Sequence, residues 1–257
     1  MAGSAVTVES RTIRAGDLDV HYLEAGSGPP LVLLHGGTAT AESWGDWLPR
    51  LAARYHVFAP DTRGHGQTNN PAGRLGYDLF ADDAAAFIAA LGIERPLVLG
   101  YSDGGQAALE LGLRHPGIAR ALVLGGTVSR PTADYLDGLT NWGFPATGEV
   151  DVAKLAEVWG EHFEALKTMH RDWQDFLRQI SHLWLTLPTY SDAQLATIAV
   201  PTLVVMGDRD HMGGPEEALR LFRPLPRGEL ALLPGMGHEA MERGLFRDVV
   251  EEFLGRQ

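Results

Sequence analysis

Leu97-Val98-Leu99-Gly100-Tyr101-Ser102-Asp103-Gly104-Gly105 is a short apolar run that ends in the pattern Gly-x-Ser-x-Gly, and a helix-period pattern starts directly after it. This is the strand–turn–helix context of a nucleophile elbow, where a serine sits on a sharp turn at the top of a strand. Side chains at Gly100 and Gly104 would collide in such a turn. The stretch predicts that Ser102 is an exposed nucleophile, and the alternative is a plain glycine turn.

The composition limits the class of protein that carries this stretch. The chain has 257 residues, 45% of them hydrophobic, which suits one or two domains with a sizeable core. Its 21 basic and 33 acidic side chains give a net charge of −12, which argues against a nucleic-acid or anionic-membrane partner. The absence of cysteine excludes disulfides, a thiolate nucleophile and a cysteine-based metal site. The first ten residues show no signal-peptide pattern and no apolar run approaches a membrane span, so we expect a soluble cytoplasmic protein.

Apolar runs alternate with helix-period patterns over most of the chain. Strands are expected at Ala5–Val8, Leu18–Leu23, Leu31–Leu34, Val57–Ala59, Leu97–Leu99, Ala121–Leu124, Pro201–Met206 and Glu229–Leu233. Helices are expected at Ser43–Ala53, Leu79–Leu91, from the elbow to His115, at Ser191–Gln194, at Pro215–Leu221 and at the end of the chain. This alternation predicts an α/β fold, with a mostly parallel central sheet and helices on both faces.

The alternation stops between residues 131 and 190, where helix-period stripes follow one another and four of the six tryptophans lie. We therefore predict two units: a core formed by residues 1–130 and 191–257, and a helical cap formed by residues 131–190. In sheets of this kind the chemistry lies beyond the carboxyl ends of the strands, so the cap is expected to cover that end.

Two further side chains are needed to activate a serine hydroxyl: a histidine that takes its proton and a carboxylate that orients the histidine. After an elbow these follow in the order acid, then histidine. His238 stands in a glycine-rich loop after the last expected strand, and Asp208 and Asp210 both follow the strand that ends at Met206. From position alone, either aspartate fits.

The chain resembles the α/β-hydrolase family, in the cap-bearing serine hydrolase form of esterases and biphenyl-hydrolase-like enzymes, from Ala5 to Leu254. The matching motifs are His35-Gly36-Gly37, Asp61–Gly66, Gly100–Gly104, Gly207–Asp210 and Gly237-His238. The resemblance implies a triad of Ser102, Asp210 rather than Asp208, and His238. It also implies an oxyanion hole formed by the backbone N–H groups of Asp103 and Gly37, with Gly36 or Thr38 as alternatives to Gly37. No metal or organic cofactor is expected.

Several other residues receive weaker predictions. Gly36, Thr38, Trp142 and Trp159 are expected at the substrate pocket, because such pockets are mostly apolar, although the cap tryptophans could equally be packing residues. We expect structural roles for Asp61, Arg63 and His65, a solvated position for His211, and surface or core positions for His162, His170 and His182, which lack the spacing of a metal site.

Asp103 is the least expected residue of the elbow, because the position after the nucleophile is often apolar in this fold. Its carboxylate could accept a cation on the substrate, such as an α-ammonium group. It could instead point away and orient neighbouring backbone.

The predicted reaction is acyl transfer to water, with small carboxylic esters as substrates, including lactones, thioesters and amino-acid esters. One alternative is cleavage of an amide, or of a carbon–carbon bond in a meta-cleavage product, by the same triad. Against carbon–carbon cleavage, the chain continues from Gly37 as Thr38-Ala39-Thr40, without the further Gly-Pro-Gly character usual in relatives that cleave such bonds. A second alternative is a ligand receptor that retains the triad with negligible turnover. The expected partner is a small molecule, and the sequence does not indicate the oligomeric state.

Overall fold

The computed structural model of the chain describes residues 6–257, and within them eight strands form one sheet. The strands are β1 (Val8–Ala15), β2 (Leu18–Gly26), β3 (Pro30–Leu34), β4 (His56–Pro60), β5 (Leu97–Tyr101), β6 (Ala121–Gly125), β7 (Thr202–Gly207) and β8 (Gly228–Leu233). Their order across the sheet is β1-β2-β4-β3-β5-β6-β7-β8. The β1–β2 and β2–β4 pairs are antiparallel and every other pair is parallel, which confirms the predicted mostly parallel sheet.

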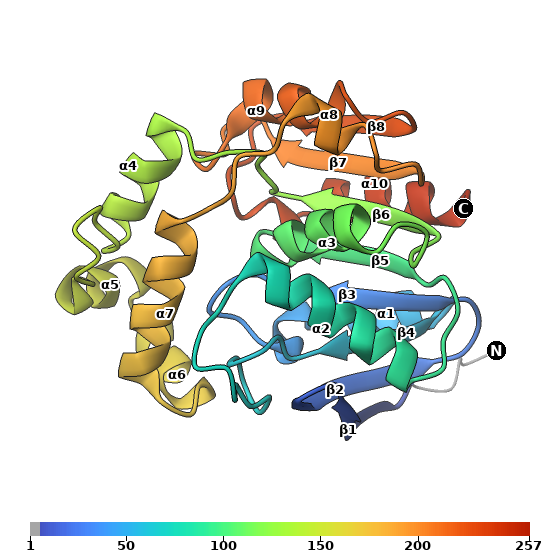
Figure 1. Cartoon of the computed structure of the whole chain (residues 1–257), viewed down its shortest axis with the longest axis horizontal. Helices are drawn as coiled ribbons and strands as arrows, with labels where there is room; N and C mark the ends of the chain where they lie inside the picture. Colours follow the sequence, from blue (N-terminus) through green and yellow to red (C-terminus); the bar gives the residue numbers. More distant parts are fainter. Residues whose placement is uncertain (1–5) are drawn as a thin grey trace.

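Helices cover both faces of this sheet (Figure 1). Those outside residues 131–190 are α1 (Trp47–Ala52), α2 (Tyr77–Ala90), α3 (Asp103–Arg114), α8 (Asp192–Leu195), α9 (Gly214–Phe222) and α10 (Gly244–Gly255), with short 3₁₀ helices at Ala41–Trp44 and Ala240–Glu242. Successive side chains of β3 point to opposite faces. Val32 and Leu34 join the core under α2 and α3, whereas Leu31 and Leu33 join the core under α1 and α10. Burial on both faces explains why the parallel strands are continuously apolar.

Two expected elements differ from the structure. The first strand is Val8–Ala15 instead of Ala5–Val8, and Ala5 lies outside the described residues. The prediction failed because β1 is mostly exposed at the sheet edge, where pairing with β2 replaces apolar alternation as the stabilising interaction. The helix expected over Ser43–Ala53 is divided into Ala41–Trp44 and α1, because Gly45 between them has φ +42°.

Residues 131–190 contain α4 (Ala133–Asn141), α5 (Val152–Trp159), α6 (His162–Met169) and α7 (Trp173–Leu185). The helix-period apolar stripe from Val152 to Leu166 is divided between α5 and α6 at Gly160, whose φ is +51°. These four helices lie together on the side to which the arrowhead of β7 points (Figure 1). They therefore lie at the carboxyl ends of the parallel strands.

The chain returns to the core through α8, which lies where the sequence predicts a short helix and begins with a capping box. Ser191 accepts from the Gln194 backbone N–H, and the Gln194 side chain accepts from the Ser191 backbone N–H. Across residues 6–257, none of the helices combines the length and apolar character that a membrane crossing requires.

Candidate active site

The elbow lies where β5, in the middle of the sheet, turns into α3. Ser102 has φ +54° and ψ −118°, a strained conformation for a residue with a side chain. A Cβ atom on Gly100 would lie 2.0 Å from the Gly104 carbonyl oxygen, and one on Gly104 would lie 1.9 Å from the Leu34 carbonyl oxygen. Only glycine fits these two positions. The turn places Ser102 at the N-cap of α3, next to the loop that follows β3.

The structure brings Ser102, His238 and Asp210 together. The Ser102 Oγ and the His238 Nε2 are 2.9 Å apart. The His238 Nδ1 lies 2.9 Å from the Asp210 Oδ2 and 3.1 Å from its Oδ1. The loop that carries His238 is held by the Tyr101 hydroxyl, which donates to the His238 carbonyl oxygen at 2.7 Å. The result is one continuous hydrogen-bond chain across the ends of β5, β7 and β8.

The charges of His238 and Asp210 stabilise each other. Burial disfavours the protonated form of His238, but attraction to Asp210 and the hydrogen bond between them prevail and raise the pKa of His238 above 6.5. Burial likewise disfavours the ionised form of Asp210, but attraction to His238 prevails and lowers the pKa of its carboxyl. Asp210 is therefore an ionised partner that favours an N–H on the Nδ1 of His238.

Asp208 takes a different position. Its side chain is exposed, and its Oδ1 accepts from the Gly235 N–H at 2.6 Å. It holds the turn that leads from β8 to His238 instead of contacting the imidazole. The geometry thus separates two aspartates that position along the chain leaves equivalent.

Two backbone N–H groups beside Ser102 have no acceptor. They are the backbone N–H groups of Asp103, the first residue of α3, and of Gly37, and neither has an acceptor among residues 6–257. The N-terminus of a helix favours negative charge. A Cβ on Gly37 would lie 2.5 Å from the Asp103 Oδ2 and 2.6 Å from the Trp184 ring, so this close approach requires glycine. The two amides are suitable donors for an oxyanion that develops beside Ser102.

Gly36 and Thr38 flank that amide. A Cβ on Gly36 would lie 3.4 Å from the Ser102 Cβ, so the backbone passes directly beside Ser102. Thr38 has φ +58°, and its carbonyl oxygen lies 3.0 Å from the Nε2 of His170, a buried side chain that follows α6. Burial lowers the pKa of His170 to about 4. A neutral His170 therefore connects residues 131–190 to this loop.

A cavity opens beside Ser102. The residues that line it are Tyr77, Ser102, Asp103, Gln106, Gly126, Val128, Tyr135, Trp142, Trp184, Met212 and His238. Of the pocket residues predicted from the sequence, Trp142 lines this cavity, with its ring 6.1 Å from that of His238. Trp159 does not. The centre of its ring instead lies 6.4 Å from that of the Phe144 ring and 6.3 Å from that of the Trp173 ring.

The Asp103 side chain forms part of the cavity wall and is 7% exposed. Its Oδ1 accepts from the Tyr77 hydroxyl at 2.8 Å, and its Oδ2 accepts from the Trp184 Nε1 at 2.7 Å. Burial raises the pKa of the Asp103 carboxyl, although both hydrogen bonds oppose the shift. The side chain therefore connects α2, α3 and α7 beside Ser102.

Sequence reasoning missed Tyr77, Trp184 and Gln106. Gln106 has a signal that could have been used, because it lies four residues after Ser102 and hence on the same face of α3. Tyr77 and Trp184 have no local signal. They belong to elements 26 and 81 residues away from Asp103, and only the fold brings them to it.

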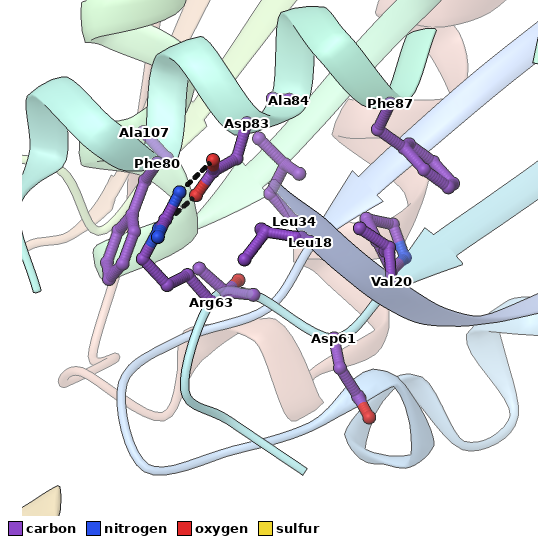
Figure 2. A pocket seen from close by; sticks show the side chains of 12 residues that line it. Leu18, Val20, Leu34, Asp61, Arg63, Phe80, Asp83, Ala84, Phe87 and Ala107 are labelled. Carbon is purple, nitrogen blue, oxygen red and sulfur yellow. Dashed lines mark hydrogen bonds and ion pairs between the residues drawn. The ribbon is translucent and has the colours of Figure 1, made fainter. Parts of the chain in front are cut away.

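The loop after β4 is held in place by the buried side chains of Asp61 and Arg63. The Asp61 carboxylate accepts from the backbone N–H groups of Ala41 at 2.8 Å and Gln67 at 2.9 Å. Arg63 is 3% exposed and donates to Asp83 at 2.6 and 2.8 Å (Figure 2). It also donates to Asp17 at 2.9 Å. The small cavity drawn in Figure 2 lies between these groups and apolar residues of β2, β3 and α2, inside the core. Its lining does not include Ser102.

A second serine–histidine–aspartate array lies at the sheet edge. The Ser10 Oγ is 2.9 Å from the His21 Nε2, and the His21 Nδ1 is 2.8 Å from the Asp61 Oδ2. Ser10 belongs to the extended strand β1, so neither an elbow nor a helix N-terminus accompanies it. Ser10 thus has the same serine–histidine distance as Ser102 but lacks the elbow and the helix N-terminus. It is therefore a matched control for Ser102.

Other histidines occupy varied positions. His162 and His182 are exposed, and the exposed His211 packs its ring 5.1 Å from that of Trp142. In the part of the chain that the structure describes, no three or more His, Cys, Asp or Glu side chains form a group that could hold a metal ion.

Comparison with known proteins places this geometry in a family. The model of the alpha/beta hydrolase family matches residues 31–249. The 2-hydroxy-6-oxo-6-(2'-aminophenyl)hexa-2,4-dienoic acid hydrolase of Metapseudomonas resinovorans is 30% identical over 255 residues, which cover 90% of this chain and 85% of that protein. The pimeloyl-acyl-carrier-protein methyl ester esterase of Neisseria meningitidis serogroup C is 31% identical over 246 residues, which cover 85% and 92%.

A solved structure of a meta-cleavage product hydrolase is similar with a TM-score of 0.82 and 25% identity, over 96% of this chain and 98% of that one. The resemblance inferred from the sequence motifs is therefore confirmed. The family match extends over the elbow and over both loops that carry Asp210 and His238, and the chain belongs to the α/β-hydrolase family of enzymes.

Proposed function

We propose that the chain is a serine hydrolase of small carboxylic esters that carry no carboxylate, including lactones, thioesters and amino-acid esters, with Ser102 as the nucleophile. The observation that carries this proposal is the hydrogen-bond chain from Ser102 through His238 to Asp210, in which Ser102 and His238 line a cavity. A residue set of this kind, beside two unpaired backbone amides, suits acyl transfer.

In the proposed mechanism, His238 takes the Ser102 proton as the Ser102 Oγ attacks the ester carbonyl. Asp210 holds the imidazole tautomer and stabilises its cation, and the N–H groups of Gly37 and Asp103 stabilise the tetrahedral oxyanion. The oxyanion collapses, and His238 gives its proton to the departing alcohol. Water then attacks the acyl-enzyme with His238 as the base, which releases the acid and restores Ser102.

The charge of the cavity supports an ester over the carbon–carbon alternative. Meta-cleavage products such as the dienoic acid of the M. resinovorans relative carry a carboxylate, which needs a cationic partner when it is desolvated. Among the described residues that line the cavity there is no lysine or arginine, and Asp103 adds a carboxylate of its own. A neutral ester avoids the cost of burying a negative charge here. The carbon–carbon alternative is supported by the names of two of the similar proteins.

A direct comparison of substrates tests the proposal. We expect p-nitrophenyl acetate and butyrate to be hydrolysed over many turnovers, with kcat/KM far above that for 2-hydroxy-6-oxo-6-(2'-aminophenyl)hexa-2,4-dienoate. Faster cleavage of the dienoate would establish the carbon–carbon alternative. A single turnover, or none, on every substrate would favour a receptor that retains the triad.

The pH dependence of the reaction follows from His238. Only its neutral form can accept the Ser102 proton, and its pKa is raised above 6.5. We therefore expect kcat/KM for a neutral ester to rise with pH, to show an apparent pKa above 6.5, and then to level off. A profile that is flat from about pH 6 to about pH 8, or that falls as pH rises, would contradict the role of His238.

We further propose that residues 131–190 act as a cap that shapes the substrate pocket. Trp142 lines the cavity and is only partly buried, so Trp142→Ala is expected to enlarge the pocket at modest cost in stability. The variant should shift the preference among p-nitrophenyl esters toward longer acyl chains. Trp159→Ala is the control, because Trp159 packs away from the cavity. Equal losses on all chain lengths, with a lowered melting temperature, would mean that Trp142 only packs.

A further inference from the structure

Gln106 differs from the other cavity residues in having a buried amide oxygen without a partner. The residue is 3% exposed and is one of those that line the cavity beside Ser102. Its Nε2 donates to the Val128 carbonyl oxygen at 2.8 Å. Because a carbonyl oxygen can only accept, this bond fixes the orientation of the amide. The Oε1 is then left without a donor among the described residues.

Such an oxygen requires an explanation, because buried acceptors are nearly always paired and an unpaired one destabilises the fold. The bond to the Val128 carbonyl oxygen uses only the Nε2 donor of the Gln106 amide and leaves the Oε1 without a structural role. An acceptor at this position gains a partner when a ligand that carries a donor enters the cavity.

Gln106 lies close to Ser102 along α3. Its backbone N–H donates to the Ser102 carbonyl oxygen at 2.9 Å, so it lies one helical turn beyond the nucleophile. Four residues of α-helix advance about 6 Å along the axis. Asp103 lies three residues before Gln106 and hence on the same side of α3. The side-chain oxygens of Asp103 and Gln106 therefore both lie on the side of α3 that lines the cavity.

We propose that the Gln106 Oε1 is a substrate-binding acceptor, and that the natural ester carries a hydrogen-bond donor, a hydroxyl or an ammonium group, two or three bonds from the scissile carbonyl. This proposal rests on the proposed ester hydrolase function. Two or three bonds and one hydrogen bond of about 2.9 Å together span about the 6 Å by which four helical residues advance from Ser102 to Gln106. The Gln106 side chain then selects among esters without taking part in the chemistry.

Isosteric pairs of p-nitrophenyl esters test the proposal. In the first pair, 3-hydroxybutanoate is compared with 3-methylbutanoate, and in the second, 2-hydroxypropanoate is compared with 2-methylpropanoate. Each pair exchanges a donor hydroxyl for a methyl group of similar size. The 3-aminobutanoate ester distinguishes an ammonium donor from a hydroxyl. The ratio of kcat/KM within each set is measured for the wild type, for Gln106→Met, and for the control Ser181→Ala, which removes another unpaired buried oxygen outside the cavity lining.

We expect the wild type to favour at least one donor-bearing ester over its methyl isostere by about tenfold, which corresponds to one well-formed hydrogen bond. Gln106→Met should abolish this ratio while retaining activity on the methyl isostere, and Ser181→Ala should leave the ratio unchanged. If the wild type shows no preference for any donor-bearing ester, the subsite is overturned even if Gln106→Met fails to fold. A preference that survives in a folded Gln106→Met overturns it as well. Failure to turn over any ester, the methyl isosteres included, overturns the proposed function and this inference with it.

Discussion

Replacing Ser102 with alanine is expected to lower kcat on a small ester by about 10⁴- to 10⁶-fold, with little change in KM. The variant removes the atom that would form the acyl-enzyme and leaves the cavity and the oxyanion amides in place. The fold should be unaffected, because alanine is smaller than serine and the Ser102 backbone bond to the Gly125 carbonyl at 2.8 Å does not involve the side chain. Steady-state kinetics and thermal unfolding of the same preparation test both expectations.

Ser10→Ala is the matched control for this variant. Ser10 has the same hydrogen-bond distance to a histidine as Ser102, 2.9 Å in both cases. It lacks the elbow and the adjacent helix N-terminus. We expect Ser10→Ala to retain activity close to that of the wild type. A loss for Ser10→Ala that equals the loss for Ser102→Ala would mean that the elbow and the helix N-terminus do not identify the nucleophile in this chain.

Asp210→Asn is expected to lower kcat by about 10⁴-fold, because an amide would hold His238 in the wrong tautomer. The Asp210 Oδ1 also accepts from the Met212 N–H at 2.9 Å, and an asparagine would keep its carbonyl oxygen at that donor. Its NH₂ group would then face the His238 Nδ1, which could no longer carry a proton there. The Nε2 would become an N–H and could not take the Ser102 proton.

Asp208→Asn serves as the control for that substitution. The Asp208 Oδ1 accepts from the Gly235 N–H, and the oxygen of an asparagine can accept the same bond. We expect less than about a tenfold change in kcat, with a small loss of stability in the loop. If Asp208→Asn proved the more damaging of the two, the roles of the two aspartates would be reversed.

The elbow could be predicted from the sequence because its requirements are local. A turn this sharp excludes side chains at Gly100 and Gly104, and those two glycines, the apolar strand before them and the helix pattern after them all lie within one short stretch. The mostly parallel sheet was also predictable, because strands buried on both faces must be apolar throughout. β1 was missed because an exposed edge strand lacks that requirement.

The surroundings of Ser102 could not be predicted to the same depth. Whether Asp103 points into the site or away from it depends on Tyr77 and Trp184, which donate to it from α2 and α7. Likewise, whether Trp142 or Trp159 reaches the cavity depends on how α4 to α7 pack, and both belong to similar apolar stripes. These are contacts between distant elements, which periodicity and spacing do not encode.

Stoichiometric labelling with a fluorophosphonate tests the proposed nucleophile most directly. The account predicts one covalent group per chain by intact mass, located on the peptide that contains Ser102, with no label in Ser102→Ala and undiminished labelling in Ser10→Ala. Labelling should slow in Asp210→Asn, because the reagent requires the same proton transfer to His238. A label on Ser10, or on any residue other than Ser102, would contradict the central claim.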